Sequence, residues 1–408
     1  MYVCSLTTTM EKKLLSDRIR ILSESQTIGM SKLSRELSAK GVDVINLSLG
    51  EPDFITPDHI RESAKKAIDE GFTHYTPISG YPELRKAISE KFKRENNLTF
   101  SPDQVVVSTG AKQSIANVIL SLVNPGDEVI IPLPYWVSYI ELVKLAEGIV
   151  IPIAATIESD FKITPSQLEA ALTPKTKLFI FSSPCNPTGT VYTKDELKAF
   201  ADVFEKHPDV FILSDEIYEH INFLDHHVSI AGFDSIKERV IVVNGLSKSF
   251  AMTGWRIGYI GAPKWIADAC DKMQGQITSG TSSISQKAAE TALTTDLKPT
   301  LDMKEAFRRR RNLVVKLMKE IPGWKVNEPQ GAFYVFPDVS HYFGKSNGTT
   351  TINTATDLCM YLLNDAHVSI VTGEAFGAPN CVRFSYAASD DKLVEAIRRI
   401  RESLLKLG

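Results

Sequence analysis

Short apolar runs alternate with longer segments of helical periodicity between about residues 57 and 295. Five of the runs are rich in Val and Ile, and each stops at a polar residue, a glycine or a proline: QVVVST (104–109), DEVIIPL (127–133), KLFIFSS (177–183), VFILSD (210–215) and RVIVVN (239–244). Continuously apolar strands separated by helices are typical of a parallel or mixed sheet that is covered on both faces. The pattern therefore predicts a large α/β domain over residues 57–295. In such a sheet, ligands bind beyond the carboxyl ends of the strands.

The pattern changes after residue 295. A charged helical segment near 300–320 leads to the apolar stretches GAFYVFPDV and CVRFSYA, and an amphipathic helix ends the chain. We interpret residues 16–56 and 296–408 as a smaller α+β domain. Residues 1–15 are expected to be an N-terminal extension, extra or disordered, with Met10 as an alternative start. The Gly/Ser/Thr-rich piece at 275–285 is either an ordered site loop or a mobile connection.

Composition narrows the class of protein. The 408 residues are 43% hydrophobic and 23% charged with a formal net charge of −3, which gives no electrostatic reason to expect nucleic acid or a membrane surface as a partner. No apolar run approaches the roughly 18 residues that span a bilayer. The five cysteines are scattered and odd in number, which favours a reducing cytoplasm over a disulfide framework or a zinc site.

The segment NGLSKSFAMTGWRIG (244–258) holds the first candidate for chemistry, Lys248. A lysine that forms an imine must be partly desolvated, so that its amine is neutral near pH 7. Ser247 and Arg256 are suited to hold a phosphate, one as a hydroxyl donor and the other as a planar bidentate cation. The alternative is that Lys248 is an ordinary surface lysine and Arg256 a helix-cap or salt-bridge residue.

Polar residues follow two other predicted strands. Asp215 in SDEIYEH can pair with a protonated pyridine nitrogen or serve as a helix N-cap, and Tyr218 lies close by if a turn starts there. Asn186 in SSPCNPTG can donate to a phenolate or carboxylate oxygen, although the motif also suits a plain Pro/Gly turn.

Three more segments suggest a ligand. Gly110 and Ala111 stand just before a predicted helix, whose free amides and dipole favour a phosphate. Trp136 in LPYWVSY can stack on a pyridine ring or belong to the core. Arg383 lies in an apolar strand, where a charge is costly unless it is paired with a substrate carboxylate or in a structural ion pair.

Together these motifs strongly resemble the fold-type I, class I aminotransferases, which depend on pyridoxal 5′-phosphate. Within that family, the chain is most similar to bacterial aspartate aminotransferases of the gamma subgroup. The resemblance covers the chain from about residue 15 onwards. It rests on GEPDF (50–54), HYTPISG (74–80), GAK (110–112), PYW (134–136), NPTG (186–189), SDEIY (214–218), SKSFAMTGWRIG (247–258) and VRFSYA (382–387). It implies a large domain with a mixed, mostly parallel sheet between helices, a smaller α+β domain, and a homodimer with sites at the subunit interface.

The resemblance also implies roles for single residues. Lys248 holds the cofactor as a Schiff base and later moves the proton, while Asp215 pairs with the pyridine nitrogen. Tyr218 and Asn186 bond to the phenolate oxygen, and Trp136 stacks on the ring. The implied phosphate contacts are Gly110, Ala111, Lys112, Ser247, Arg256 and, from the neighbouring subunit, Tyr75. The implied substrate contacts are Arg383 and Asn186 on the α-carboxylate and the backbone of Gly50, with Trp136 and Lys112 beside them.

The implied reaction moves the amino group of an L-amino acid, aspartate in first place, to 2-oxoglutarate through pyridoxamine phosphate. The loop 275–285 contains no Arg or Lys to bind a distal carboxylate. We therefore hypothesise that Lys112 does so, with Thr27 and Ser283 nearby; the alternative is that Lys112 only supports the phosphate. Prephenate, aromatic or alanine specificity stays open, as does a carbon–sulfur β-lyase on the same scaffold.

Other classes fit less well. A transcription regulator with an aminotransferase-like domain would carry a DNA-binding module ahead of it, and only about twenty residues precede the match. Neither GxGxxG nor GxxxxGK[ST] follows a predicted strand. His220, His226 and His227 are interpreted as part of a surface loop, and no metal is expected.

Overall fold

The computed structural model describes residues 14–24, 26–224 and 226–408. Nearly all of the expected extension at 1–15 therefore lies outside the described residues. No helix in the described part of the chain is long and apolar enough to cross a membrane.

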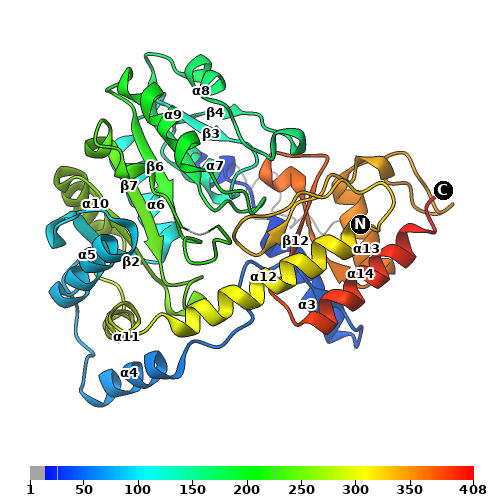
Figure 1. The fold of residues 1–408 in the computed structure, drawn as a ribbon, viewed down its shortest axis with the longest axis horizontal. Helices are drawn as coiled ribbons and strands as arrows, with labels where there is room; N and C mark the ends of the chain where they lie inside the picture. The colour runs from blue at the N-terminus through cyan, green and yellow to red at the C-terminus, as the bar shows by residue number, and fades with distance from the viewer. Residues whose placement is uncertain (1–13, 25, 225) are drawn as a thin grey trace.

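A seven-stranded sheet forms the centre of the larger part of the molecule (Figure 1). Every neighbouring pair is parallel except those made by β8, which runs antiparallel to β2 and β7. The prediction of a mixed, mostly parallel sheet between helices is confirmed. The strand order is β2 (Val105–Thr109), β8 (Ile257–Gly261), β7 (Val240–Gly245), β6 (Phe211–Asp215), β5 (Thr176–Ser182), β3 (Glu128–Pro132) and β4 (Ile149–Ile153).

The apolar runs form these strands because alternate side chains go to opposite faces, and both faces are buried. In β2, for example, Val105 and Val107 belong to one hydrophobic cluster and Val106 to another. The first cluster is completed by α4 (Asp58–Asp69), α5 (Pro82–Asn96), α8 (Pro165–Ala171), α9 (Lys194–Glu205) and α11 (Ser283–Thr294). The second is completed by α6 (Ala111–Leu122), α7 (Ser138–Leu145) and α10 (Lys264–Ile277).

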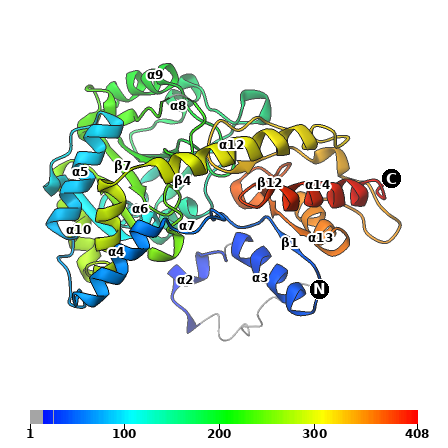
Figure 2. The same cartoon turned by 60° about the horizontal axis from the view of Figure 1, so that its bottom comes forward.

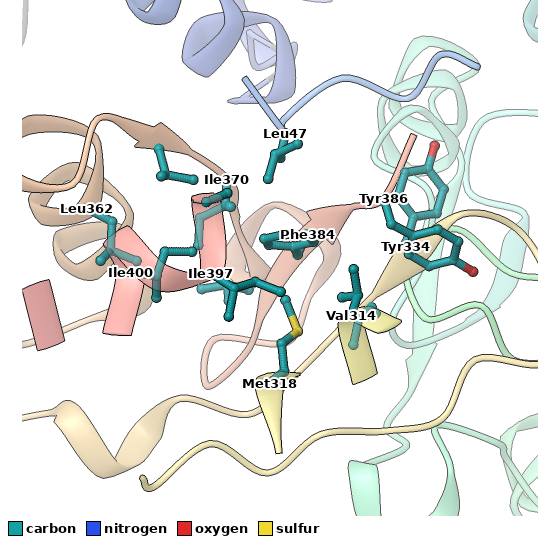
Figure 3. Close-up of a cluster of buried hydrophobic side chains, with 14 of the residues drawn as sticks. Leu47, Val314, Met318, Tyr334, Leu362, Ile370, Phe384, Tyr386, Ile397 and Ile400 are labelled. Carbon is teal, nitrogen blue, oxygen red and sulfur yellow. The ribbon is translucent and has the colours of Figure 1, made fainter. Parts of the chain in front are cut away.

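A separate hydrophobic cluster joins residues from both ends of the chain (Figure 3). Leu47 follows the short strand β1 (Ile45–Asn46), which pairs in parallel with β10 (Val368–Ser369). Three further strands form a second small sheet, in the order β11 (Val371–Thr372), β12 (Val382–Ser385) and β9 (Tyr334–Val335). Packed around them are α3 (Gln26–Ala39), α12 (Lys298–Met318), α13 (Ala355–Asp365) and α14 (Asp390–Leu404).

Helices from two parts of the chain link the central sheet to the hydrophobic cluster of the smaller sheets. The long helix α12 runs from beside α11 towards the cluster around β12 (Figure 1). Helix α2 (Asp17–Ile21) lies against α7, and the Ser23 amide donates to Glu141 Oε2 at 2.8 Å. Helix α3 follows α2 on the same side of the molecule (Figure 2). Residues from before β1 thus reach the carboxyl edge of the central sheet.

Candidate active site

A cavity of about 330 Å³ lies beyond the carboxyl ends of β5, β6 and β7, between the central sheet and α3. The position agrees with the rule for open α/β sheets. Predicted residues from distant segments meet there: Thr27, Gly50, Ala111, Lys112, Trp136, Asn186, Asp215, Tyr218, Ser247, Lys248, Arg256 and Arg383.

Lys248 reaches the cavity from the turn after β7, and its amine donates to the Gly50 carbonyl at 2.6 Å. Burial lowers the pKa of this amine from its ordinary 10.5 to about 8. The neutral amine is the form that can attack a carbonyl group, and its share at neutral pH rises as the pKa falls. This position does not fit an ordinary surface lysine.

Asp215 ends β6 and is only 5% exposed. Its carboxylate accepts hydrogen bonds from Tyr139 Oη at 2.7 Å and from the Ile217 amide at 3.3 Å. Burial nevertheless raises the pKa of Asp215 from 3.8 to about 6, because no cation in the described residues forms an ion pair with it. Asp215 is therefore a buried carboxylate suited to a cationic ligand. Tyr139 was missed from the sequence, although it follows Trp136 by one helical turn.

The junction of β2 and α6 forms a tight cradle. Gly110 has φ +84, and a Cβ at this position would lie 2.1 Å from Arg256 Nη2. Helix α6 begins directly after it, at Ala111. The first amides of a helix have no partners within the helix, and no side-chain cap is present here to accept from them. Arg256 donates to the Thr253 carbonyl at 2.8 Å and forms no ion pair in the described chain. The helix start, the arginine and the nearby Ser247 hydroxyl together suit an anion such as phosphate.

Arg383 projects from β12 and is 2% exposed. Its guanidinium donates to Asn186 Oδ1 at 3.0 Å and to the Ser48 carbonyl at 2.6 Å, while the buried Nε has no partner. Burial lowers the pKa of Arg383. No carboxylate pairs with it among the described residues, so the alternative of a structural ion pair is not supported. A charge left so deep in the protein calls for an anionic ligand.

Lys112 also lines the cavity, from the first turn of α6. Its amine lies 5.1 Å from the centre of the Trp136 ring. Burial, and next the charge of Arg256, lower the pKa of Lys112. Thr27 and Ser31, both on α3, line the cavity, whereas Ser283 does not and instead donates to the Phe72 carbonyl.

Tyr75 is also absent from the cavity lining, and its side chain is 100% exposed. Within one chain the structure therefore does not bring Tyr75 to the other site residues. The Gly/Ser/Thr-rich piece at 275–285 is ordered as the end of α10, a short link and the start of α11.

The interpretation of the three histidines as a surface loop is wrong for two of them. His227 hydrogen-bonds Glu216 Oε2 at 2.8 Å, and His220 lies between Glu95 Oε2 at 2.9 Å and Ser249 Oγ at 2.8 Å. Only His226 is exposed. Glu216 of the SDEIYEH turn binds His227 and Glu95 of α5 binds His220, because buried acids need nearby donors. Acidic and histidine side chains in this region lie close enough together to hold a metal ion. The Lys91 amine, however, already hydrogen-bonds Glu219, which is one of these side chains.

The chain matches the family described as aminotransferase class I and II over residues 42–400. It is 47% identical to the bifunctional aspartate aminotransferase and glutamate/aspartate-prephenate aminotransferase of Petunia hybrida, over 96% of this chain and 83% of that protein. It is also 47% identical to the aspartate/prephenate aminotransferase of Cereibacter sphaeroides, over 95% and 98% of the two chains.

Solved structures agree with the sequence comparisons. The aspartate aminotransferase of Rhizobium meliloti superposes with a TM-score of 0.93 at 42% identity, covering 97% of this chain and 99% of that one. The aspartate aminotransferase of Thermus thermophilus with maleate superposes with a TM-score of 0.90 at 39% identity, covering 95% and 99%. This chain belongs to the class I and II aminotransferase family. The predicted family and enzyme class are thus confirmed.

Proposed function

We propose that this chain is a pyridoxal 5′-phosphate-dependent aspartate aminotransferase with 2-oxoglutarate as amino acceptor. One observation carries the proposal: Asp215, Lys248 and Arg383 face a single cavity, and none of them has an ion-pair partner in the described chain. Unpaired charge inside a protein is costly. A ligand that offers a cation to Asp215, a carbonyl to Lys248 and a carboxylate to Arg383 removes that cost.

The residues present fit pyridoxal phosphate. Asp215 would hold the protonated pyridine nitrogen, and the cradle of Gly110, Ala111, Ser247 and Arg256 would hold the phosphate. Trp136 offers a flat ring in the same cavity. When bound, the cofactor supplies an electron sink for negative charge at the substrate's α-carbon.

Lys248 would carry the proton. Its pKa of about 8 lies close to neutral pH, where a general base works best. Arg383 and Asn186 would fix the α-carboxylate by two parallel contacts, which orients the α-hydrogen towards the lysine. Tyr218 and Asn186 would donate to the phenolic oxygen of the cofactor, and Gly50 would leave room for the substrate next to its backbone.

Tyr75 supports a homodimer as part of the proposal. Its side chain is fully exposed, and large apolar side chains such as Ile55, Ile68 and Ile277 are also exposed, at 76%, 56% and 55%. Such surface suits a second copy of the chain. Tyr75 would then donate to the phosphate in the partner's site. A cytoplasmic location stays a prediction from the scattered cysteines.

The test is an optical and chemical assay of the purified protein saturated with pyridoxal phosphate. We expect visible absorbance of lysine-bound cofactor. Aspartate alone should remove that absorbance and release about one equivalent of oxaloacetate per site, and 2-oxoglutarate should restore it and allow continued oxaloacetate formation. Pyruvate release from a cysteine conjugate without amine transfer would instead indicate a β-lyase. Protein that binds no cofactor at saturation would overturn the proposal.

Lys112 is the candidate that sets the specificity for a second carboxylate. It is a partly buried cation without an ion-pair partner in the described chain, and it lines the cavity beside Trp136. Relatives named for both aspartate and prephenate act on compounds with a second carboxylate.

We expect Lys112→Met to lower kcat/KM for aspartate about 10- to 100-fold, with little change for alanine, because one charged hydrogen bond is lost. Cofactor affinity, measured by fluorescence titration, separates this role from phosphate binding. Equal losses for both amino acids together with weaker cofactor binding would assign Lys112 to the phosphate alone.

A further inference from the structure

Tyr334 is a buried residue of the site to which the predicted chemistry gives no role. It belongs to the GAFYVF stretch, begins β9 and has no exposed surface. Its ring packs at the edge of the hydrophobic cluster, and its hydroxyl points outwards from that cluster (Figure 3). The same side chain lines the cavity that holds Lys248. Tyr334 therefore joins the cluster around β12 to the candidate active site.

The register of the small sheet places Tyr334 against Arg383. Tyr334 on β9 pairs with Ser385 on β12, and Arg383 stands two residues before Ser385. Side chains two residues apart on a strand share a face, and diagonal neighbours on adjacent strands are within reach of long side chains. The guanidinium carbon of Arg383 accordingly lies 4.6 Å from the centre of the Tyr334 ring. This ring supports the arginine by a cation–π contact.

The hydroxyl of Tyr334 makes a different contact. It lies 2.8 Å from the hydroxyl of Tyr218, its one hydrogen-bond partner among the described residues. A Cβ added to Gly50 would lie 2.6 Å from the same oxygen, so the hydroxyl is packed directly against that glycine. The Gly50 carbonyl in turn accepts from Lys248. One tyrosine thus touches three residues of the proposed machinery: Tyr218, Gly50 and Arg383.

The number of protons decides the direction of the hydroxyl–hydroxyl bond. Each phenol has one proton to donate. When Tyr218 donates its proton to the phenolic oxygen of the cofactor, the bond between the two tyrosines can form only if Tyr334 donates to Tyr218. Hydrogen bonds in such a chain polarise and strengthen one another.

We propose that Tyr334 is a positioning residue, which donates to Tyr218 and so makes it a stronger donor to the cofactor. The inference rests on the proposed function, because it needs Tyr218 to contact the cofactor. Through its ring, the same residue holds Arg383 at the place where the α-carboxylate binds. Hydroxyl and ring therefore act on different parts of the reaction, and they can be separated by substitution.

Tyr334→Phe removes the hydroxyl and keeps the ring. A weaker donor at the phenolic oxygen leaves that oxygen more basic, so the bound cofactor keeps its titrating proton to higher pH. We expect the pH midpoint of the visible cofactor absorbance, measured without substrate, to rise by about half to one pH unit, the effect of one hydrogen bond. KM for aspartate should change little while kcat falls. Tyr334→Leu should raise KM as well, because the cation–π support is lost.

Tyr386→Phe is the matched control. Tyr386 is equally buried in the same cluster, and its hydroxyl donates to the Ala332 carbonyl at 3.1 Å, outside the cavity lining. This variant should lower the melting temperature about as much as Tyr334→Phe but leave the absorbance titration at the wild-type midpoint. An unshifted Tyr334→Phe, or an equal shift in Tyr386→Phe, would overturn the inference. Wild-type protein without cofactor absorbance would instead overturn the proposed function.

Discussion

The turn after β6 carries two sets of buried charge with different neighbours. Asp215 faces the cavity, as does Lys248 from the next strand, and neither has an ion partner in the described chain. Glu216 and Glu219 face α5 and the 227–229 segment, where Lys91 and His227 pair with them. Both sets are buried to similar depth, yet only the second is satisfied by the protein itself. The contrast separates residues that stabilise the fold from residues kept for a ligand.

Carboxylates of the two sets titrate in opposite directions. Burial raises the pKa of Asp215 to about 6. Burial acts in the same direction on Glu219, but the charge of Lys91 and its other donors outweigh it and hold the pKa of Glu219 well below its ordinary 4.5. Asn96 and Asn244 also donate to Glu219, at 2.6 and 2.8 Å. An acid surrounded by donors contributes stability, whereas an unpaired acid takes stability away until a ligand arrives.

The largest expected effect comes from the two buried lysines. Lys248→Ala should lower transamination by about three orders of magnitude or more, because it removes the group that moves the proton. The melting temperature should stay the same or rise, because a partly buried, unpaired amine is lost. Enzyme assays and thermal denaturation of cofactor-free protein measure the two effects. A marked loss of stability would instead show that Lys248 stabilises the fold, as Lys91 is expected to do.

Lys91→Met is the counterpart on the other side of the turn. The substitution leaves Glu219 buried without its cation, so the free energy of unfolding should fall by about 3–5 kcal/mol. Urea denaturation of the cofactor-free protein measures this loss. Turnover per folded molecule should remain within a few-fold of wild type, because Lys91 does not line the cavity. Unchanged stability would contradict the assignment of Lys91 to the fold.

A smaller effect should appear in the pH dependence of stability. Because the native state holds the Asp215 proton more tightly than the unfolded state, cofactor-free protein should lose stability as the pH rises from about 4 to about 6. Asp215→Asn should remove this loss and stabilise the protein at pH 7 by about 3 kcal/mol. Denaturation curves across this pH range check the sign.

Glu219→Gln is the control for that experiment. The pKa of Glu219 is lowered in the folded protein, so its contribution is present above the ordinary value of 4.5 and is lost as the pH falls below it. In the Glu219→Gln variant the free energy of unfolding should change less with pH on the acid side than in the wild type, and it should be lower than the wild-type value at pH 7. A variant of Glu219 that stabilised the protein would contradict the contrast between the two carboxylates.

Local patterns in the sequence predicted the sheet and most of the residues that meet beyond its carboxyl edge, whereas Gly50 and Lys112 were implied only by the family resemblance. Apolar strands punctuated by helices define the sheet, and the polar residues at the strand ends define the site. The paired set was not predicted, because Lys91 and Glu219 are 128 residues apart in the sequence. His220 and His227 were misread as part of a surface loop, because their polar neighbours in the sequence do not indicate that the carboxylates they bind are buried. Tyr139 and Tyr334 were missed for a related reason, since a tyrosine in an apolar segment is as compatible with the core as with a site.

The close fit of Gly110 to Arg256 limits how the chain can vary. A side chain at residue 110 would occupy the space of the guanidinium, with 2.1 Å between Cβ and Nη2. A larger residue at 110 therefore strains the backbone at φ +84 and pushes the guanidinium away from the anion cradle, so single substitutions of Gly110 should weaken anion binding. The two positions are 146 residues apart in the chain, yet a change at either one alters the space available to the other. Recombinants of parents that differ at both positions should therefore bind the anion less well when only one position is exchanged.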